Sequence, residues 1–155
     1  MQYNYTGSSM GFVLNRQEVV WLHQKYPRLF YLEEAGKIAG YFDFHSTFRD
    51  ITITDSYDVR IDLVRTDPPY IPQVFEVGNR IRKTSMLYNR PLIDLHQYAD
   101  NKLCLIRPDA FIKRFLRSPF TLHNFFEIIK AVLYWQSYYE RYGKEAWPAE
   151  EHGWK

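Results

Sequence analysis

Hydrophobic and polar positions change their spacing along the chain, and these changes divide it into successive elements. Asn15 followed by Glu18 resembles a helix N-cap with a supporting acid, close to a capping box. It predicts a helix over residues 16–26, which Pro27 ends because proline removes a backbone donor. Residues 1–14 show no such pattern and predict a short, loosely structured lead.

Alternation with a period of two follows this helix and predicts four short strands. In the clearest, residues 57–64, Val59, Ile61 and Leu63 face one way and polar residues face the other. The other three segments are residues 29–32, 38–48 and 73–77, with a proline-rich bend at 67–72. Four strands joined in this order predict an antiparallel meander.

After the strands, the spacing first becomes irregular and then helical. Residues 78–108 show little periodicity, which predicts a long irregular segment, and residues 109–116 predict a short helix. A longer helix follows, with Gly143 as its C-terminal stop; its two apolar stripes indicate packing on two sides rather than an exposed binding face. Residues 147–154 are aromatic enough to predict docking on the rest of the protein. The order of elements predicts a single α+β domain over residues 1–155.

Composition and charge narrow the classes of function. Twenty basic and eighteen acidic residues give a net charge of +2, and the basic residues are scattered, so nucleic-acid binding is not predicted. No apolar stretch approaches the roughly 18 residues that span a bilayer, and the N-terminus lacks a signal-peptide pattern. With one cysteine in the chain, we expect a cytoplasmic protein. Neither a cofactor nor a metal ion is expected.

Cys104 is the only cysteine, so it makes neither an intramolecular disulfide nor a cysteine-rich metal site. Two interpretations remain, an inert buried side chain or a nucleophile. Its place near the end of the irregular segment, eight residues after His96, favours a nucleophile on an exposed rim of the sheet. Lys102 and Arg107 lie close in sequence and would favour the thiolate. We expect His96 to pin the loop backbone rather than to act as a general base.

The layout and the cysteine segment together resemble the ubiquitin-conjugating (UBC-like) family. His96 stands where that family has the histidine of a His-Pro-Asn sequence, and Leu103-Cys104-Leu105 matches its aliphatic-Cys-Leu step. The resemblance is closer to the bacterial conjugating proteins of CBASS-type antiphage defence operons than to the eukaryotic enzymes. The residues that carry this likeness are His96, Tyr98, Leu103, Cys104, Leu105, Pro108, Gly143, Trp147, Glu150 or Glu151, and His152.

The resemblance implies that Cys104 accepts the C-terminal carboxyl group of another protein as a thioester. The implied partner is a cGAS-like nucleotidyltransferase, with a ubiquitin-like protein as the alternative. The chain has no ATP-binding glycine loop, so a separate enzyme would activate that partner. Gln97 and Tyr98 replace the family's proline and asparagine, which makes Asn101 the candidate for the asparagine's role. Asp100 is the candidate proton acceptor for an incoming amine.

Two other functions stay open at the level of sequence. The first is a non-catalytic UBC-like or RWD-like interaction module whose aromatic helix and tail bind a partner. It predicts that binding depends on Trp135 or Tyr138 and not on Cys104. The second is a cysteine hydrolase that uses Cys104 and His96, which would also need an orienting group and an oxyanion site.

Overall fold

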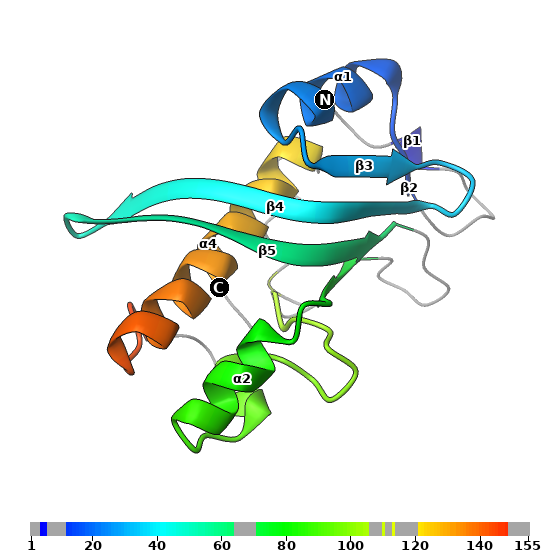
Figure 1. Cartoon of the computed structure of the whole chain (residues 1–155). Helices are drawn as coiled ribbons and strands as arrows, with labels where there is room; N and C mark the ends of the chain where they lie inside the picture. Colours follow the sequence, from blue (N-terminus) through cyan, green and yellow to red (C-terminus); the bar gives the residue numbers. More distant parts are fainter. Residues whose placement is uncertain are drawn as a thin grey trace.

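A four-stranded antiparallel sheet with a long helix across one face forms the centre of the molecule (Figure 1). The computed structural model describes residues 4–5, 12–63, 71–105, 110, 113 and 121–148. The sheet order β3-β4-β5-β6 follows the sequence, so the predicted meander and the α+β class are confirmed. The strands are β3 (Leu29–Leu32), β4 (Lys37–Phe48), β5 (Ile51–Asp62) and β6 (Gln73–Glu76).

The N-terminal helix α1 (Arg16–Lys25) begins as predicted. The N–H of Glu18 donates to Asn15 Oδ1 at 2.8 Å, and the N–H of Asn15 donates to Glu18 Oε1 at 2.9 Å, which completes the capping box. Ahead of it, β1 (Asn4–Tyr5) and β2 (Phe12–Val13) pair with each other. The prediction of a loosely structured lead is therefore wrong for these four residues.

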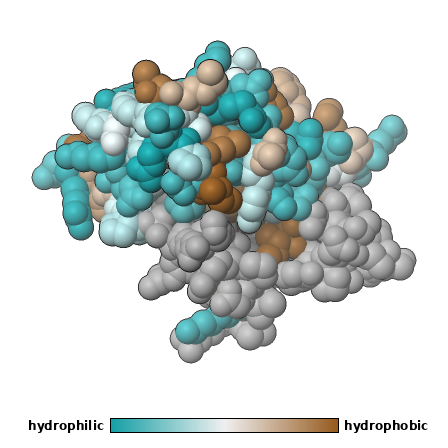
Figure 2. Space-filling model, turned by 90° about the horizontal axis from the view of Figure 1, so that it is seen from below, coloured by the Kyte–Doolittle hydropathy of each residue, from teal (hydrophilic) through white to brown (hydrophobic). Residues whose placement is uncertain are grey.

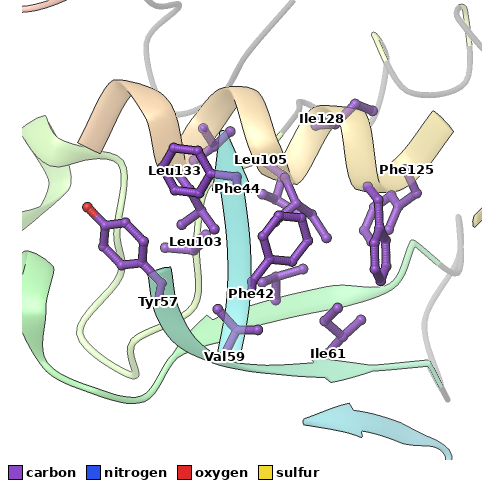
Figure 3. Packing of buried hydrophobic residues seen from close by; sticks show 14 of the residues in the cluster. Phe42, Phe44, Tyr57, Val59, Ile61, Leu103, Leu105, Phe125, Ile128 and Leu133 are labelled. Carbon is purple, nitrogen blue, oxygen red and sulfur yellow. The ribbon is translucent and has the colours of Figure 1, made fainter. Parts of the chain in front are cut away.

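Helix α4 (Leu122–Tyr142) covers the inner face of the sheet. Alternate side chains of β4 and β5, such as Phe42 and Val59, point toward it and form the core (Figure 3). Buried side chains occur all round the helix, which confirms packing on two sides. Trp135 is fully buried and Tyr138 is half-buried, so of the two residues named for the interaction module only Tyr138 reaches the surface. Gly143 ends the helix at φ 69°, where a Cβ atom would come within 2.8 Å of the Tyr88 ring.

The segment between β6 and the cysteine contains helix α2 (Arg80–Leu87) and the 3-10 helix η2 (Leu92–Leu95). The prediction of irregular chain over residues 78–108 is therefore wrong for these two elements. Two physical features hide α2 in the sequence. Its buried residues are only two, too few for an apolar stripe, and its cap comes from strand β6 rather than from the N-cap residue. Glu76 accepts the N–H of Arg80 at 3.2 Å and of Ile81 at 2.9 Å.

A partly buried cluster around Arg80 ties α2, β5 and α4 together, and we call it the Arg80 junction. The guanidinium donates to both oxygens of Asp55, at 2.8 and 2.6 Å, and to both oxygens of Glu140, at 2.8 and 2.9 Å. It also lies over the Tyr57 ring, 4.4 Å from the centroid. Ser137 donates to Asp55 at 2.8 Å, so the carboxylate at the sheet surface is held by both helices.

The C-terminal segment docks through Trp147, as expected for its aromatic composition. The Nε1 of Trp135 donates to the carbonyl of Trp147 at 3.0 Å, and the Trp147 ring stacks on Tyr134 at 5.8 Å. Residues 149–154 and nearly all of the predicted helix 109–116 lie outside the described residues. Within the described part of the chain, no helix is both long and apolar enough to cross a membrane.

Candidate functional site

Residues 96–104 form a tight hairpin, which we call the cysteine hairpin. The N–H of Asn101 donates to the carbonyl of Tyr98 at 3.0 Å, and the N–H of Tyr98 donates to the carbonyl of Lys102 at 2.9 Å. Asn101 has φ 72°, which is typical of a three-residue turn that ends in a left-handed bulge. At the base, the N–H of Cys104 donates to the carbonyl of His96 at 2.8 Å. The turn thus brings the predicted histidine and cysteine side by side.

The returning arm of the cysteine hairpin adds to the free edge of β6. The N–H of Leu103 donates to the carbonyl of Val74 at 2.8 Å, and the N–H of Glu76 donates to the carbonyl of Asn101 at 3.1 Å. Leu103 and Leu105 are buried in the core between the sheet and α4 (Figure 3). Because side chains alternate along an extended segment, Cys104 points away from that core.

Cys104 is only 4% exposed, so the expectation of an exposed rim position is wrong. Burial raises the pKa of its thiol above the ordinary range. A hydrogen bond with Tyr98 and the positive charge of Lys102 lower the pKa, but by less. Lys102 therefore lowers the pKa of the thiol, as predicted, but does not produce a thiolate at neutral pH. Arg107, the other residue expected to favour the thiolate, lies outside the described residues. The site holds a neutral thiol.

Tyr98 is a further functional candidate, which the sequence interpretation used for the resemblance without giving it a role. Its pKa is raised to about 12, first by hydrogen bonding with Cys104 and second by burial. The hydroxyl therefore keeps its proton at neutral pH and remains a donor beside the sulfur. The ammonium of Lys102 lies 4.8 Å from the centre of the Tyr98 ring, across the hairpin. The signal in the sequence is the symmetric placement of these two residues around the Asp-Asn turn.

His96 contributes to the base of the cysteine hairpin through its backbone, and the predicted hydrogen bonding of its imidazole to the loop backbone stays a prediction. Its backbone is left-handed, with φ 59°, and its carbonyl rather than its ring binds the N–H of Cys104. The ring is buried and packs edge-on against Trp135, with 5.1 Å between the ring centres. The residue links the base of the cysteine hairpin to helix α4.

Asn101 and Asp100 both hold the turn of the hairpin. Asn101 accepts a hydrogen bond from Arg82 at 2.7 Å and donates to Asn79 at 3.2 Å, which fastens the turn to α2. Asp100 accepts the N–H of Lys102 at 3.1 Å. These contacts give both side chains a shaping role, and their predicted roles toward an oxyanion or an amine stay predictions.

The described residues contain no group of three or more His, Cys, Asp or Glu side chains that could hold a metal ion. At the cysteine hairpin, the hydroxyl of Tyr98 and the ammonium of Lys102 are the groups that act on the thiol of Cys104. The sequence matches no protein-family model and no curated protein, and the fold matches no solved structure.

Proposed function

We propose that the chain is a ubiquitin-conjugating-like acyl carrier that holds the C-terminus of a partner protein as a thioester on Cys104. The observation that carries this proposal is the cysteine hairpin itself. It joins Cys104 to the carbonyl of His96, adds to the edge of a meander, and sets a protonated Tyr98 hydroxyl beside the sulfur. This agrees with the order of elements and the His-to-Cys segment that resemble the UBC-like family.

The proposed step is a transfer between two thioesters. The Cys104 thiol loses its proton to solvent, and the sulfur attacks the carbonyl carbon of the acyl group on an activating enzyme. A new C–S bond forms at Cys104, the original C–S bond breaks, and the activating enzyme leaves as a thiolate that takes up a proton. One thioester replaces another, so the step needs no strongly acidic thiol at Cys104.

The groups around the sulfur have distinct tasks in this step. The Tyr98 hydroxyl and the Lys102 ammonium stabilise negative charge, first on the thiolate and then on the tetrahedral oxyanion. The raised pKa of the thiol keeps it protonated between encounters, which limits oxidation and unproductive reaction. A neutral resting thiol therefore suits a carrier that reacts only with an activated acyl group.

The partner and setting follow from the resemblance. The acyl group would be the C-terminus of a cGAS-like nucleotidyltransferase, or of a ubiquitin-like protein, in the cytoplasm of a bacterium that uses antiphage defence. A separate enzyme would supply the activated carboxyl group. The acceptor that finally receives it would be an amine or another nucleophile.

The test is an adduct assay on non-reducing gels with ATP, an activating enzyme and each candidate partner. The wild type should form an adduct that dithiothreitol removes, Cys104→Ser an adduct that resists dithiothreitol, and Cys104→Ala none. The same adduct on Cys104→Ala, or its complete absence from the wild type with every partner, contradicts the proposal.

A second candidate function is a non-catalytic interaction module, and the burial of Cys104 favours it. Its contact residues would come from exposed side chains such as Met86 and Leu87 at the end of α2, rather than from the buried Trp135. Seen from below, hydrophobic patches interrupt a mostly hydrophilic described surface (Figure 2). On this alternative, Cys104→Ala keeps partner binding in a pull-down assay, whereas Met86→Glu abolishes it.

A further inference from the structure

Strand β4 continues well past its edge neighbour. β3 pairs with residues 37–40 only, whereas β4 runs on to Phe48. β3 is short because the chain enters it directly from helix α1, through the turn at Pro27, and the helix does not belong to the sheet. β4 and β5 therefore extend beyond β3 as a two-stranded arm (Figure 1). No strand within the described ranges pairs with the β3 side of residues 43–47, which we call the β4 edge.

The backbone hydrogen bonds identify the groups that face this edge. The N–H of Tyr41 donates to the carbonyl of Arg28 at 3.1 Å, on the β3 side of the strand. Backbone groups alternate between the two sides of a strand. The N–H and C=O groups of Asp43, His45 and Thr47 therefore point toward the β4 edge, while their even-numbered neighbours bond to β5. The edge presents three consecutive donor and acceptor pairs.

The sequence of this stretch lacks the usual protection against strand pairing. Edge strands that stay unpaired commonly carry lysine, proline or a bulge. Residues 42–48 read Phe-Asp-Phe-His-Ser-Thr-Phe, which contains neither lysine nor proline and is rich in strong strand formers. The single charge, on Asp43, is paired with Arg28. The β4 edge is therefore chemically ready to accept another strand.

Two hollows lie between the β4 edge and the helices and suit the side chains of a bound strand. The larger of these two, of about 270 Å³, lies between β4, α1 and the start of α4, and the smaller, of about 170 Å³, lies between β4 and the middle of α4. Their lining includes Trp21, Lys25 and His123 in the larger hollow, and Ala131, Tyr134 and Trp147 in the smaller one. A third hollow, of about 560 Å³, is lined by residues 43–45 of β4, residues 54–56 of β5 and Arg28.

The two hollows beside the helices differ in charge. In the larger, both carboxylates are already paired, Asp43 with Arg28 and Glu127 with Lys130 at 3.0 Å. Among the described residues, no carboxylate lies within ion-pair distance of Lys25, so the larger hollow keeps a positive charge. The smaller hollow is lined mainly by aromatic and small side chains. A strand that carries an acidic residue at one point and an apolar residue further along would complement both.

We propose that the β4 edge binds an extended segment of a partner protein as an added strand, with an acidic side chain toward Lys25 and an apolar side chain over Tyr134 and Trp147. A second copy of this chain fits less well. Its β4 is backed by its own α4, which would meet the α4 residues that line the hollows. The proposal involves neither Cys104 nor its chemistry, so it stands or falls independently of the acyl-carrier function.

The experiment titrates a synthetic peptide into the full-length, ¹⁵N-labelled protein. The probe is acetyl-Thr-Leu-Thr-Val-Thr-Asp-Thr-amide, and its control has asparagine in place of aspartate. Saturable binding should shift the amide signals of Asp43, His45 and Thr47 and slow their hydrogen exchange. The aspartate peptide should bind about fivefold more tightly, the size of a favourable exposed ion pair. Lys25→Met should remove this preference and leave binding of the asparagine peptide unchanged.

Backbone variants separate strand addition from simple side-chain contact. His45→Pro removes an N–H that faces the edge and keeps the backbone bonds between β4 and β5, although it loses the side-chain contact with Thr54, so it should weaken binding about tenfold. Thr47→Pro is the second such variant, and His45→Thr, which keeps the N–H, should bind like the wild type. Four outcomes overturn the proposal. The amide signals do not shift at millimolar peptide, or both proline variants bind the peptide as tightly as the wild type. The other two are edge amides already protected from hydrogen exchange in the free protein, and a dimer that His45→Pro dissociates.

Discussion

The Arg80 junction and the cysteine hairpin both join the sheet to a helical layer, but they do so by opposite means. At the junction, charged side chains make the connection, and Arg80 satisfies Asp55 and Glu140 with two bonds each. In the hairpin, backbone groups make the connection to the sheet, through β6 and through the carbonyl of His96, and the side chain of Asn101 fastens the turn to α2. The side chains of Tyr98, Lys102 and Cys104 are left to interact with one another.

This difference separates what holds the fold from what is available for chemistry. A side chain that stabilises a junction is fully occupied, and replacing it costs stability. A hairpin held by its backbone can place a thiol, a hydroxyl and an ammonium together without using them structurally. We therefore expect substitutions at the junction to change the free energy of unfolding, and substitutions in the hairpin to change reactivity.

The largest effect should come from Arg80→Met. It leaves Asp55 and Glu140 close together without their shared cation, which costs roughly 3 kcal/mol, the low end for a buried network, because this one is only partly buried. The melting temperature should fall by roughly 6–12 °C for a chain of this size. The matched control is Arg28→Met, which breaks the exposed pair with Asp43 and should leave the melting temperature unchanged. Equal effects of the two variants would refute the comparison.

Acid should weaken the Arg80 junction. Burial by itself would raise the pKa of Asp55, but hydrogen bonds from Arg80 and Ser137 outweigh it and hold the pKa below the usual value. The unfolded chain therefore binds this proton more readily, and the stability contributed by Asp55 is present above about pH 4 and is lost as the pH falls further. Calorimetry from pH 7 to pH 2 should show a decline that is shallower for Asp55→Asn. An identical decline in both proteins would exclude Asp55 as its source.

Smaller effects are expected in the hairpin, and they concern reactivity. Tyr98→Phe removes the hydrogen bond that lowers the pKa of Cys104, so the pH midpoint for alkylation by iodoacetamide should rise. Lys102→Met should raise it by less, because a charge exposed to solvent acts more weakly. Neither variant should change the melting temperature appreciably. A midpoint that falls in Tyr98→Phe would mean that the ring only buries the thiol.

The elements that carry their own signals were predictable from the sequence. Asn15 and Glu18 cap α1 within one turn, and Gly143 ends α4 in a conformation that glycine favours. Helix α2 was not predictable in this way, because its cap is Glu76 in the preceding strand. Local sequence signals identify helices whose end groups are capped by residues within one turn. They miss α2, because its cap comes from a residue of another element.

In the candidate site too, the features set by neighbouring residues in the sequence were predictable, and those set by the surrounding fold were not. The pairing of His96 with Cys104 was predictable, because a turn-prone segment of seven residues lies between them. The burial of Cys104 was not, since it results from the surrounding fold rather than from the polar residues beside it in sequence. The role of Tyr98 depends on alternation across the hairpin, which becomes visible only once the turn is known.

The most direct test of the acyl-carrier proposal is intact mass spectrometry of the folded protein after incubation with a glycine-ended peptide α-thioester. We predict one added peptide mass on the wild type, removed by dithiothreitol, reduced in Tyr98→Phe and absent from Cys104→Ala. Acylation only after the protein is unfolded would contradict the account, because it would mean that the folded hairpin shields Cys104 instead of presenting it.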